Sequence, residues 1–98
     1  MIKRIVKMTF RPEAVPAFLE DFETIKNKIR NIEGCQHLEL WREVDGSNVL
    51  FTYSHWKSEA DLNAYRQTDL FKSVWKRTKE KFAQRAEAWS VEVESEIG

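Results

Sequence analysis

Apolar positions along this chain follow two different periods, and the changes between them divide it into seven predicted elements. Large apolar and β-branched residues favour strands at residues 2–10, 35–43 and 49–56, and clean alternation favours a fourth at 89–94. Between residues 15 and 32, apolar residues recur at three- and four-residue steps, as on one face of a helix. Two further helices are predicted after residue 57. The order β-α-β-β-α-α-β predicts an α+β, ferredoxin-like fold: a four-stranded antiparallel sheet with its helices on one face.

Short local signals mark the element boundaries. Gly34 is expected to end the first helix, and Asp45-Gly46 predicts a hairpin turn between the second and third strands. Ser58 is placed to cap the second helix, with Asp61 three residues later as in a capping box. Thr68 then begins the third helix. No linker or low-complexity run interrupts this pattern, so we expect a single domain over residues 1–98.

Both faces of the first three predicted strands carry apolar side chains. Because side chains alternate along a strand, Val6 and Met8 share one face of the first strand while Ile5 lies on the other. Helices in this topology cover only one face of the sheet. A second copy of the chain is the simplest cover for the other face, so we expect a homodimer joined through the sheet faces. The fourth strand alternates as a half-solvated strand would.

The charge balance and the cysteine content narrow the class of protein. Sixteen basic and sixteen acidic residues cancel, so no general electrostatic attraction to nucleic acid or to an anionic membrane is expected. Cys35 is the single cysteine and cannot form an internal disulfide, and the N-terminus lacks an apolar signal segment. No segment is long and apolar enough to span a bilayer. These features predict a cytoplasmic protein with no nucleic-acid or membrane partner.

Motifs for bound cofactors are missing from the sequence. There is no glycine-rich phosphate loop, no CxxC, no HExxH and no GxSxG. One cysteine and two histidines cannot build a thiolate-rich zinc site. We therefore expect no nucleotide cofactor and no metal.

Two histidines and a set of aromatic residues are the candidates for chemistry. His37 and His55 lie in predicted strands, and either could act as a general base if it faced a cavity. The alternative is a hydrogen-bonded histidine at the dimer interface or sheet edge. Several aromatic residues could line a pocket for a flat substrate or could form ordinary core: Tyr53, Trp56, Tyr65, Trp75 and Trp89.

The segments HWKSEADLNAY and TDLFKSVWKR, at residues 55–65 and 68–77, resemble the antibiotic biosynthesis monooxygenase (ABM) family. This resemblance covers almost the whole chain through the order of strands and helices. It implies a dimeric α+β barrel, with two sheets packed face to face and a ligand cavity between sheet and helices in each protomer. Members of the family include cofactor-free oxygenases of polyketide anthrones, quinol monooxygenases and haem-degrading enzymes.

The resemblance also indicates which positions would contact a ligand. The haem-degrading branch uses an asparagine, a tryptophan and an axial histidine, whose positions correspond here to Val6, Tyr65 and Trp75. None of the three is retained, so haem degradation is not expected. The residues that match or neighbour the family's pocket positions are the predicted substrate-binding residues: Val6, Met8, Trp56, Tyr65 and Trp75.

Three hypotheses follow for the function. The first is a cofactor-independent monooxygenase acting on an aromatic or quinol-like small molecule, in which an ionised phenol or quinol itself reduces oxygen. The second is a non-catalytic dimeric module that binds a small apolar ligand. The third is a barrel that only supports assembly, with its cavity filled by its own aromatic side chains.

Overall fold

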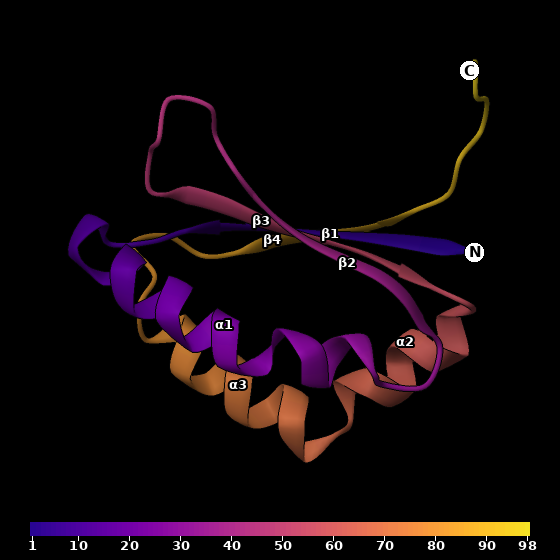
Figure 1. The fold of residues 1–98 in the computed structure, drawn as a ribbon, viewed down its shortest axis with the longest axis horizontal. Helices are drawn as coiled ribbons and strands as arrows, with labels where there is room; N and C mark the ends of the chain where they lie inside the picture. Colours follow the sequence, from indigo (N-terminus) through magenta and orange to yellow (C-terminus); the bar gives the residue numbers. More distant parts are fainter.

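Three helices lie on one face of a four-stranded sheet, and the other face of the sheet is left open (Figure 1). The computed structural model describes residues 1–98. The elements occur in this order: β1 (Ile2–Thr9), the short 3-10 helix η1 (Pro12–Ala14), α1 (Val15–Arg30), β2 (Cys35–Arg42), β3 (Val49–Trp56), α2 (Glu59–Arg66), α3 (Asp69–Lys79) and β4 (Glu87–Val91). The strands pair antiparallel in the order β2-β3-β1-β4. The predicted ferredoxin-like α+β fold is therefore confirmed.

The last strand differs from its prediction. It spans Glu87–Val91, whereas alternation had predicted residues 89–94. Pairing with β1 explains the shift, because β4 runs from the Lys7↔Glu87 pair to the Lys3↔Val91 pair. β1 begins at Ile2, so residues beyond 92 have no strand left to pair with. Apolar and polar residues continue to alternate beyond Val91, but the start of β1 sets the end of β4 because no further residues are available for pairing.

Side-chain caps start α2 and α3 where the sequence predicted them. The Ser58 hydroxyl accepts a hydrogen bond from the Asp61 backbone N–H at 3.1 Å and donates one to the Asp61 carboxylate at 3.0 Å. The Thr68 hydroxyl accepts from the Phe71 N–H at 3.1 Å. These bonds satisfy backbone donors that the first turn of a helix leaves free. They fix the direction in which α2 and α3 leave the sheet.

Gly34 joins α1 to β2 at a point where only glycine fits. Its φ is +88°, in the left-handed region. A Cβ atom at this position would also lie 2.4 Å from the Cβ of Asp61, in the first turn of α2. The turn therefore brings the end of α1 and the start of α2 into close contact.

Two groups of buried apolar residues hold the helices against the sheet. The larger one lies toward the start of α1 and contains Met8, Phe10, Val15, Phe18, Phe22 and Leu50. The smaller one lies near the start of α2 and contains Cys35, Trp56 and Leu62.

None of the helices is long and apolar enough to cross a membrane.

Candidate functional site

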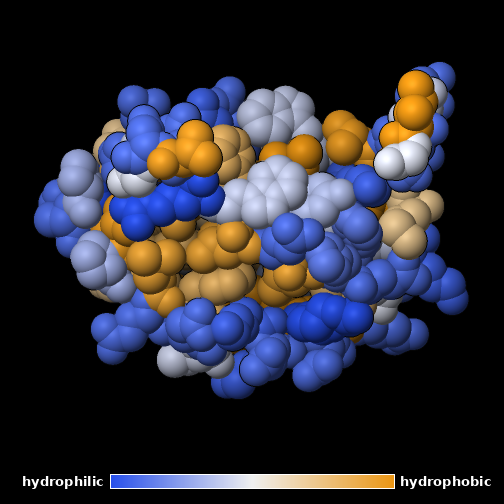
Figure 2. Space-filling model, turned by 45° about the horizontal axis from the view of Figure 1, so that its top comes forward, coloured by the Kyte–Doolittle hydropathy of each residue, from blue (hydrophilic) through white to orange (hydrophobic).

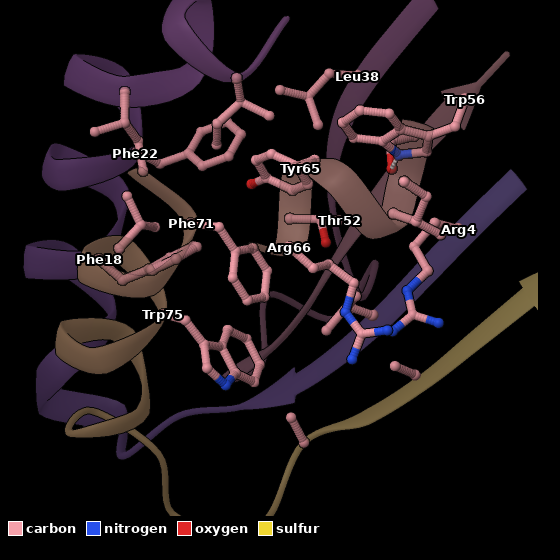
Figure 3. A pocket seen from close by; sticks show the side chains of 18 residues that line it. Arg4, Phe18, Phe22, Leu38, Thr52, Trp56, Tyr65, Arg66, Phe71 and Trp75 are labelled. Atoms are coloured by element: carbon pink, nitrogen blue, oxygen red, sulfur yellow. Dashed lines mark hydrogen bonds between the residues drawn. The ribbon is translucent and has the colours of Figure 1, made fainter. Parts of the chain in front are cut away.

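A cavity of about 480 Å³ lies between the sheet and the helices (Figure 3). Eighteen residues line it, and fourteen of them are hydrophobic. Small-molecule sites in proteins commonly enclose roughly 300–1,000 Å³ and have mainly apolar walls with a few polar groups. The size and the lining therefore suit one small organic molecule with a largely hydrocarbon body.

A continuous row of aromatic rings from β3, α2 and α3 lines this cavity. The row starts on β3, where the ring of Trp56 stacks on Tyr65 with centroids 4.8 Å apart. Tyr65 then meets Phe71 edge-on at 5.2 Å, and Phe71 lies nearly parallel to Trp75 at 6.1 Å. Figure 3 shows Tyr65, Phe71 and Trp75 following one another along the cavity wall. Flat aromatic surfaces in this arrangement favour a flat ligand, because stacked and edge-on contacts are both available.

The polar groups of the lining are few and are unevenly placed. Arg4, Thr52, Ser54 and Arg66 are the four polar residues among the eighteen, and Tyr65 adds a hydroxyl. Neither the Thr52 hydroxyl nor the Tyr65 hydroxyl has a hydrogen-bond partner, whereas the Ser54 hydroxyl accepts from the Trp56 indole N–H at 2.9 Å. Two hydroxyl groups are therefore free to bind a ligand.

Burial keeps the Tyr65 hydroxyl protonated. Loss of solvent, with a smaller contribution from Cys35, raises the pKa of Tyr65 to about 12. At neutral pH this phenol is a hydrogen-bond donor and cannot serve as a base. No histidine, aspartate or glutamate lines the cavity.

The structure brings together most of the predicted substrate-binding residues. Val6, Trp56, Tyr65 and Trp75 all line the cavity. Met8 shares their face of the sheet, but it is 2% exposed and packs in the larger core group without lining the cavity. Val15 at the start of α1 and Leu50 on β3 belong to the same buried group as Met8. Met8 is therefore enclosed by core side chains and lies outside the cavity that Val6, two residues earlier, lines.

The two histidines lie on the opposite, open face of the sheet. His37 and His55 are neighbours in the β2–β3 ladder, with ring centroids 5.0 Å apart. The His55 Nε2 and the Tyr53 hydroxyl are hydrogen bonded at 2.7 Å, and the His37 Nε2 contacts the Glu39 carboxylate. The sheet separates both imidazoles from the cavity, so neither can take a proton from a ligand bound there within this protomer.

The open face also carries three of the seven exposed large apolar side chains. Trp41 on β2, with Trp89 and Val91 on β4, are 38%, 44% and 41% exposed. Figure 2, in which the side without helices is turned partly toward the viewer, shows pale aromatic rings and orange apolar residues beside blue polar ones. The β2–β3 turn and the C-terminal segment rise beyond the sheet on the side without helices (Figure 1), and they expose Val44 and Ile97. The open face thus combines exposed apolar side chains with charged ones, including the Lys7–Glu87 ion pair, and lies between two projections.

Arg4 and Arg66 are site residues that the sequence analysis did not identify. Arg4 lies on β1 on the same face as Val6, and Arg66 lies in the last turn of α2. The sequence could have indicated Arg4, because a charged residue on the apolar face of a strand is unusual and is often found at a binding site. Arg66 gave no such signal, since a basic residue in the last turn of a helix is ordinary.

The residues present do not suit a metal or a haem iron. No group of three or more histidine, cysteine, aspartate or glutamate side chains lies close enough together to hold a metal ion. Trp75, which the family resemblance predicted at the position of the axial histidine of the haem-degrading branch, lines the cavity with an indole ring that has no free lone pair for iron.

Solved structures with the same fold come from several organisms. A protein from Methanosarcina mazei Go1 superposes with a TM-score of 0.87 at 22% sequence identity, covering 92% of this chain and 89% of its own. An antibiotic biosynthesis monooxygenase superposes with a TM-score of 0.88 at 18% identity, covering 95% of this chain and 98% of its own. Rv0793 from Mycobacterium tuberculosis gives 0.87 at 18% identity, with coverages of 99% and 98%. At these identities the likeness establishes the fold alone.

Sequence comparison gives the family directly. No curated protein matches the chain with significance. The family model described as antibiotic biosynthesis monooxygenase, however, matches residues 1–77, which include everything from β1 to the greater part of α3. The chain therefore belongs to the antibiotic biosynthesis monooxygenase (ABM) family.

Proposed function

We propose that this protein is a cofactor-independent monooxygenase that binds a flat aromatic or quinol-like molecule in the cavity between sheet and helices. The observation that carries the proposal is the row of aromatic rings from Trp56 to Trp75 along a cavity of about 480 Å³. Membership of the ABM family supports the oxygenase activity. In this reading the protein orients the substrate and excludes water, and the substrate supplies the electrons.

The reaction balances without an external reductant for an anthrone-type substrate, in which a CH₂ group is conjugated through aromatic rings to a ketone. Loss of one proton gives a carbanion, which passes an electron to O₂, and the two radicals join to form a C–O bond. Protonation of the resulting peroxide is followed by cleavage of the O–O bond and loss of the second C–H proton. The products are a new C=O group and one molecule of water, so one oxygen atom enters the substrate and the other leaves as water.

Oxygen uptake with 1,8-dihydroxyanthrone as the probe tests the activity. We expect the protein to accelerate uptake above the uncatalysed rate, with one atom of ¹⁸O from ¹⁸O₂ at the new carbonyl, and we expect dialysis against a chelator to leave the rate unchanged. Filling the cavity by Val74→Trp should abolish the acceleration. The matched control is Val93→Trp, because Val93 lies outside the cavity and is 53% exposed. Equal rates with and without protein, for this probe and for a panel of quinols, would contradict the proposal.

The catalytic role predicted for His37 and His55 has its own test. Chemistry confined to the cavity predicts that His37→Ala and His55→Ala keep kcat within about twofold. A general base would instead cost on the order of 10²–10⁴-fold in kcat. A loss of that size in either variant, with the fold intact, would move the reaction to the open face.

A non-catalytic binding module is the second candidate, and one observation favours it. No group that could accept a proton at neutral pH lines the cavity, since its ionisable residues are two arginines and a tyrosine whose pKa is raised to about 12. Tight binding of the aromatic probe without oxygen uptake would establish this reading.

The homodimer is part of the proposal. Two open faces packed together would cover the exposed Trp41, Trp89 and Val91, and the projections that carry Val44 and Ile97 would reach the partner. An obligate interface of this kind buries roughly 2,000 Å² or more in total. Sedimentation velocity should give a dimer at micromolar concentration, and a monomer there would contradict it.

A further inference from the structure

Two arginine side chains stand together at one end of the cavity. Arg4 reaches it from β1 and Arg66 from the end of α2, and Figure 3 shows their guanidinium groups side by side. The Arg4 guanidinium donates a hydrogen bond to the Ser90 hydroxyl on β4 at 3.0 Å, which holds it toward the β4 side of the cavity. Neither arginine takes part in an ion pair with an acidic residue, although five such pairs form elsewhere in the chain.

The two positive charges repel each other, although solvent screens part of this repulsion because Arg66 is exposed. Partial burial, and then the charge of Arg66, lower the pKa of Arg4 from its usual value. Arginine remains protonated at neutral pH, so the two positive charges persist and repel each other. An anion between them would remove the repulsion, and the guanidinium fork suits two oxygen atoms in one plane.

We propose that Arg4 and Arg66 together bind an anionic oxygen group, a carboxylate or an ionised phenol, carried at one end of the flat molecule that occupies the aromatic part of the cavity. The inference rests on the proposed function, because it names the substrate class of the same site. The fourteen hydrophobic lining residues take the hydrocarbon body, and the arginine pair fixes which end points toward β1 and β4. The substrate is therefore amphipathic: apolar, flat and negatively charged at one end.

The pair also accounts for how a substrate could ionise in a cavity that has no base. Two nearby positive charges stabilise a phenolate over its phenol, which lowers the pKa of the bound substrate. The proton then passes to solvent, and the anion, whose charge the aromatic rings share between the oxygen and the reacting carbon, is the electron-rich form that can pass an electron to O₂. The arginines take the place of the general base by shifting the ionisation equilibrium of the substrate.

A pair of probes that differ only in charge tests this inference. Anthraquinone-2-carboxylate and anthraquinone-2-carboxamide share a flat body, and calorimetric titration gives their affinities directly. We expect the carboxylate to bind at least about tenfold more tightly than the carboxamide, since a charge-assisted hydrogen bond contributes enough for roughly that factor. Arg4→Gln and Arg66→Gln should each reduce this preference, and the double variant should remove it. Lys28→Gln is the control, because it removes one positive charge from an exposed position on α1 outside the cavity.

A second measurement covers the ionised-phenol form and does not depend on the variants folding. The phenolate of 2-hydroxyanthraquinone has its own visible absorption, so its ionisation can be followed in the wild-type complex. We expect ionisation of the bound probe at a pH lower by about one unit or more than in solution. A shift in the phenol with no preference for the carboxylate would assign the site to phenolates, and the reverse result would assign it to carboxylates.

Each remaining outcome is informative. Equal affinities for carboxylate and carboxamide, together with an unshifted phenol, would overturn the inference and leave the cavity's proposed function intact. A preference for the anion that persists in the double arginine variant would also overturn it, by placing anion recognition elsewhere. Tight binding of the carboxylate without oxygen uptake from any substrate would contradict the monooxygenase instead. Failure of both anthraquinones to bind would contradict both proposals.

Discussion

The helix-covered face and the open face of this sheet are made by alternate residues of the same four strands, yet they carry different chemistry. The covered face contributes Trp56 and Arg4 to the cavity, the other rings of the aromatic row and the second arginine come from α2 and α3, and no imidazole or carboxylate lines this cavity. The open face holds two neighbouring hydrogen-bonded pairs, His37 with Glu39 and His55 with Tyr53, near exposed tryptophans. Within a strand, residues two apart therefore lie on the same face and share its chemistry, whereas adjacent residues lie on opposite faces.

This division has a consequence for the chemistry of the site. Both imidazoles are on the face suited to association, whereas the ionisable residues that line the cavity are two arginines and a tyrosine. A reaction in the cavity would then depend on ionisation of the substrate itself, which the arginine pair would favour by lowering the pKa of the bound substrate. The open-face group would respond to pH through assembly or stability.

The largest expected effect contrasts two tryptophans, one from each face. Trp56 is 1% exposed in the smaller core group, so Trp56→Ala should cost about 3–5 kcal/mol of unfolding free energy. Trp41 is 38% exposed on the open face, so Trp41→Ala should cost little in the monomer and act mainly through the dimer. Denaturant unfolding at several protein concentrations checks this, because only the Trp41 effect should depend on concentration. A cost for Trp41 that is the same at all concentrations would break the comparison.

The next effect concerns assembly. Ile5 lies on β1, one of the two central strands, and its neighbours across the open face are Tyr53 and Trp89. Ile5→Glu should weaken dimer formation by about 100-fold or more, since it replaces an apolar side chain by a carboxylate that must be desolvated at the centre of the proposed interface. Sedimentation equilibrium measures the dissociation constant. Thr24→Glu on an exposed position of α1 is the matched control and should leave the dimer intact.

The cavity face should lose stability on the alkaline side. The pKa of Tyr65 is raised from 10.0 to about 12, so the folded state favours the neutral phenol more than the unfolded state does. Stability is then complete below pH 10 and falls as the pH rises toward 12, by on the order of 2 kcal/mol. Thermal unfolding between pH 9 and 12 should show this fall, and Tyr65→Phe should reduce it. An alkaline loss that is unchanged in Tyr65→Phe would assign it to another group.

The sequence carried most of the fold because each element has a local signal. The Ser58 and Thr68 caps and the apolar stripe of α1 each act within a few residues, and the structure confirms them. The predicted end of the first helix was wrong, because α1 ends at Arg30 with Asn31 as its C-cap, and Gly34 lies in the turn that follows. The end of β4 depended on where β1 begins, which is a pairing between distant segments and has no local signal.

The site was predicted in part for the same reason. Alternation places Val6 and Trp56 on one face, and the helix stripe places Trp75 toward it, so their meeting at the cavity follows from pattern. The arginine pair did not follow, because Arg4 and Arg66 come from separate elements and meet only through the packing of α2 on the sheet. Alternation along the strand places His55 on the same face as Phe51 and Tyr53. It does not indicate which face the helices cover, so the side of the sheet on which His55 lies could not be predicted.

The smallest expected effect is an acid-side loss of stability from the open face. Burial, and then the charges of Lys3 and His37, lower the pKa of His55 from its ordinary value of 6.5, while Glu39 acts in the opposite direction. The unfolded chain therefore takes up this proton at a higher pH than the folded chain does. Stability from this residue is complete above pH 6.5 and is lost as the pH falls through the lower pKa of the folded state. We expect a small fall in Tm between pH 7 and 5, larger at protein concentrations that favour the dimer, because packing of the open faces would desolvate His55 further. His55→Gln should reduce this fall while leaving the alkaline loss from Tyr65 unchanged. If His55→Gln reduced both losses equally, the two faces would not titrate independently, and the division between a binding face and an assembly face would fail.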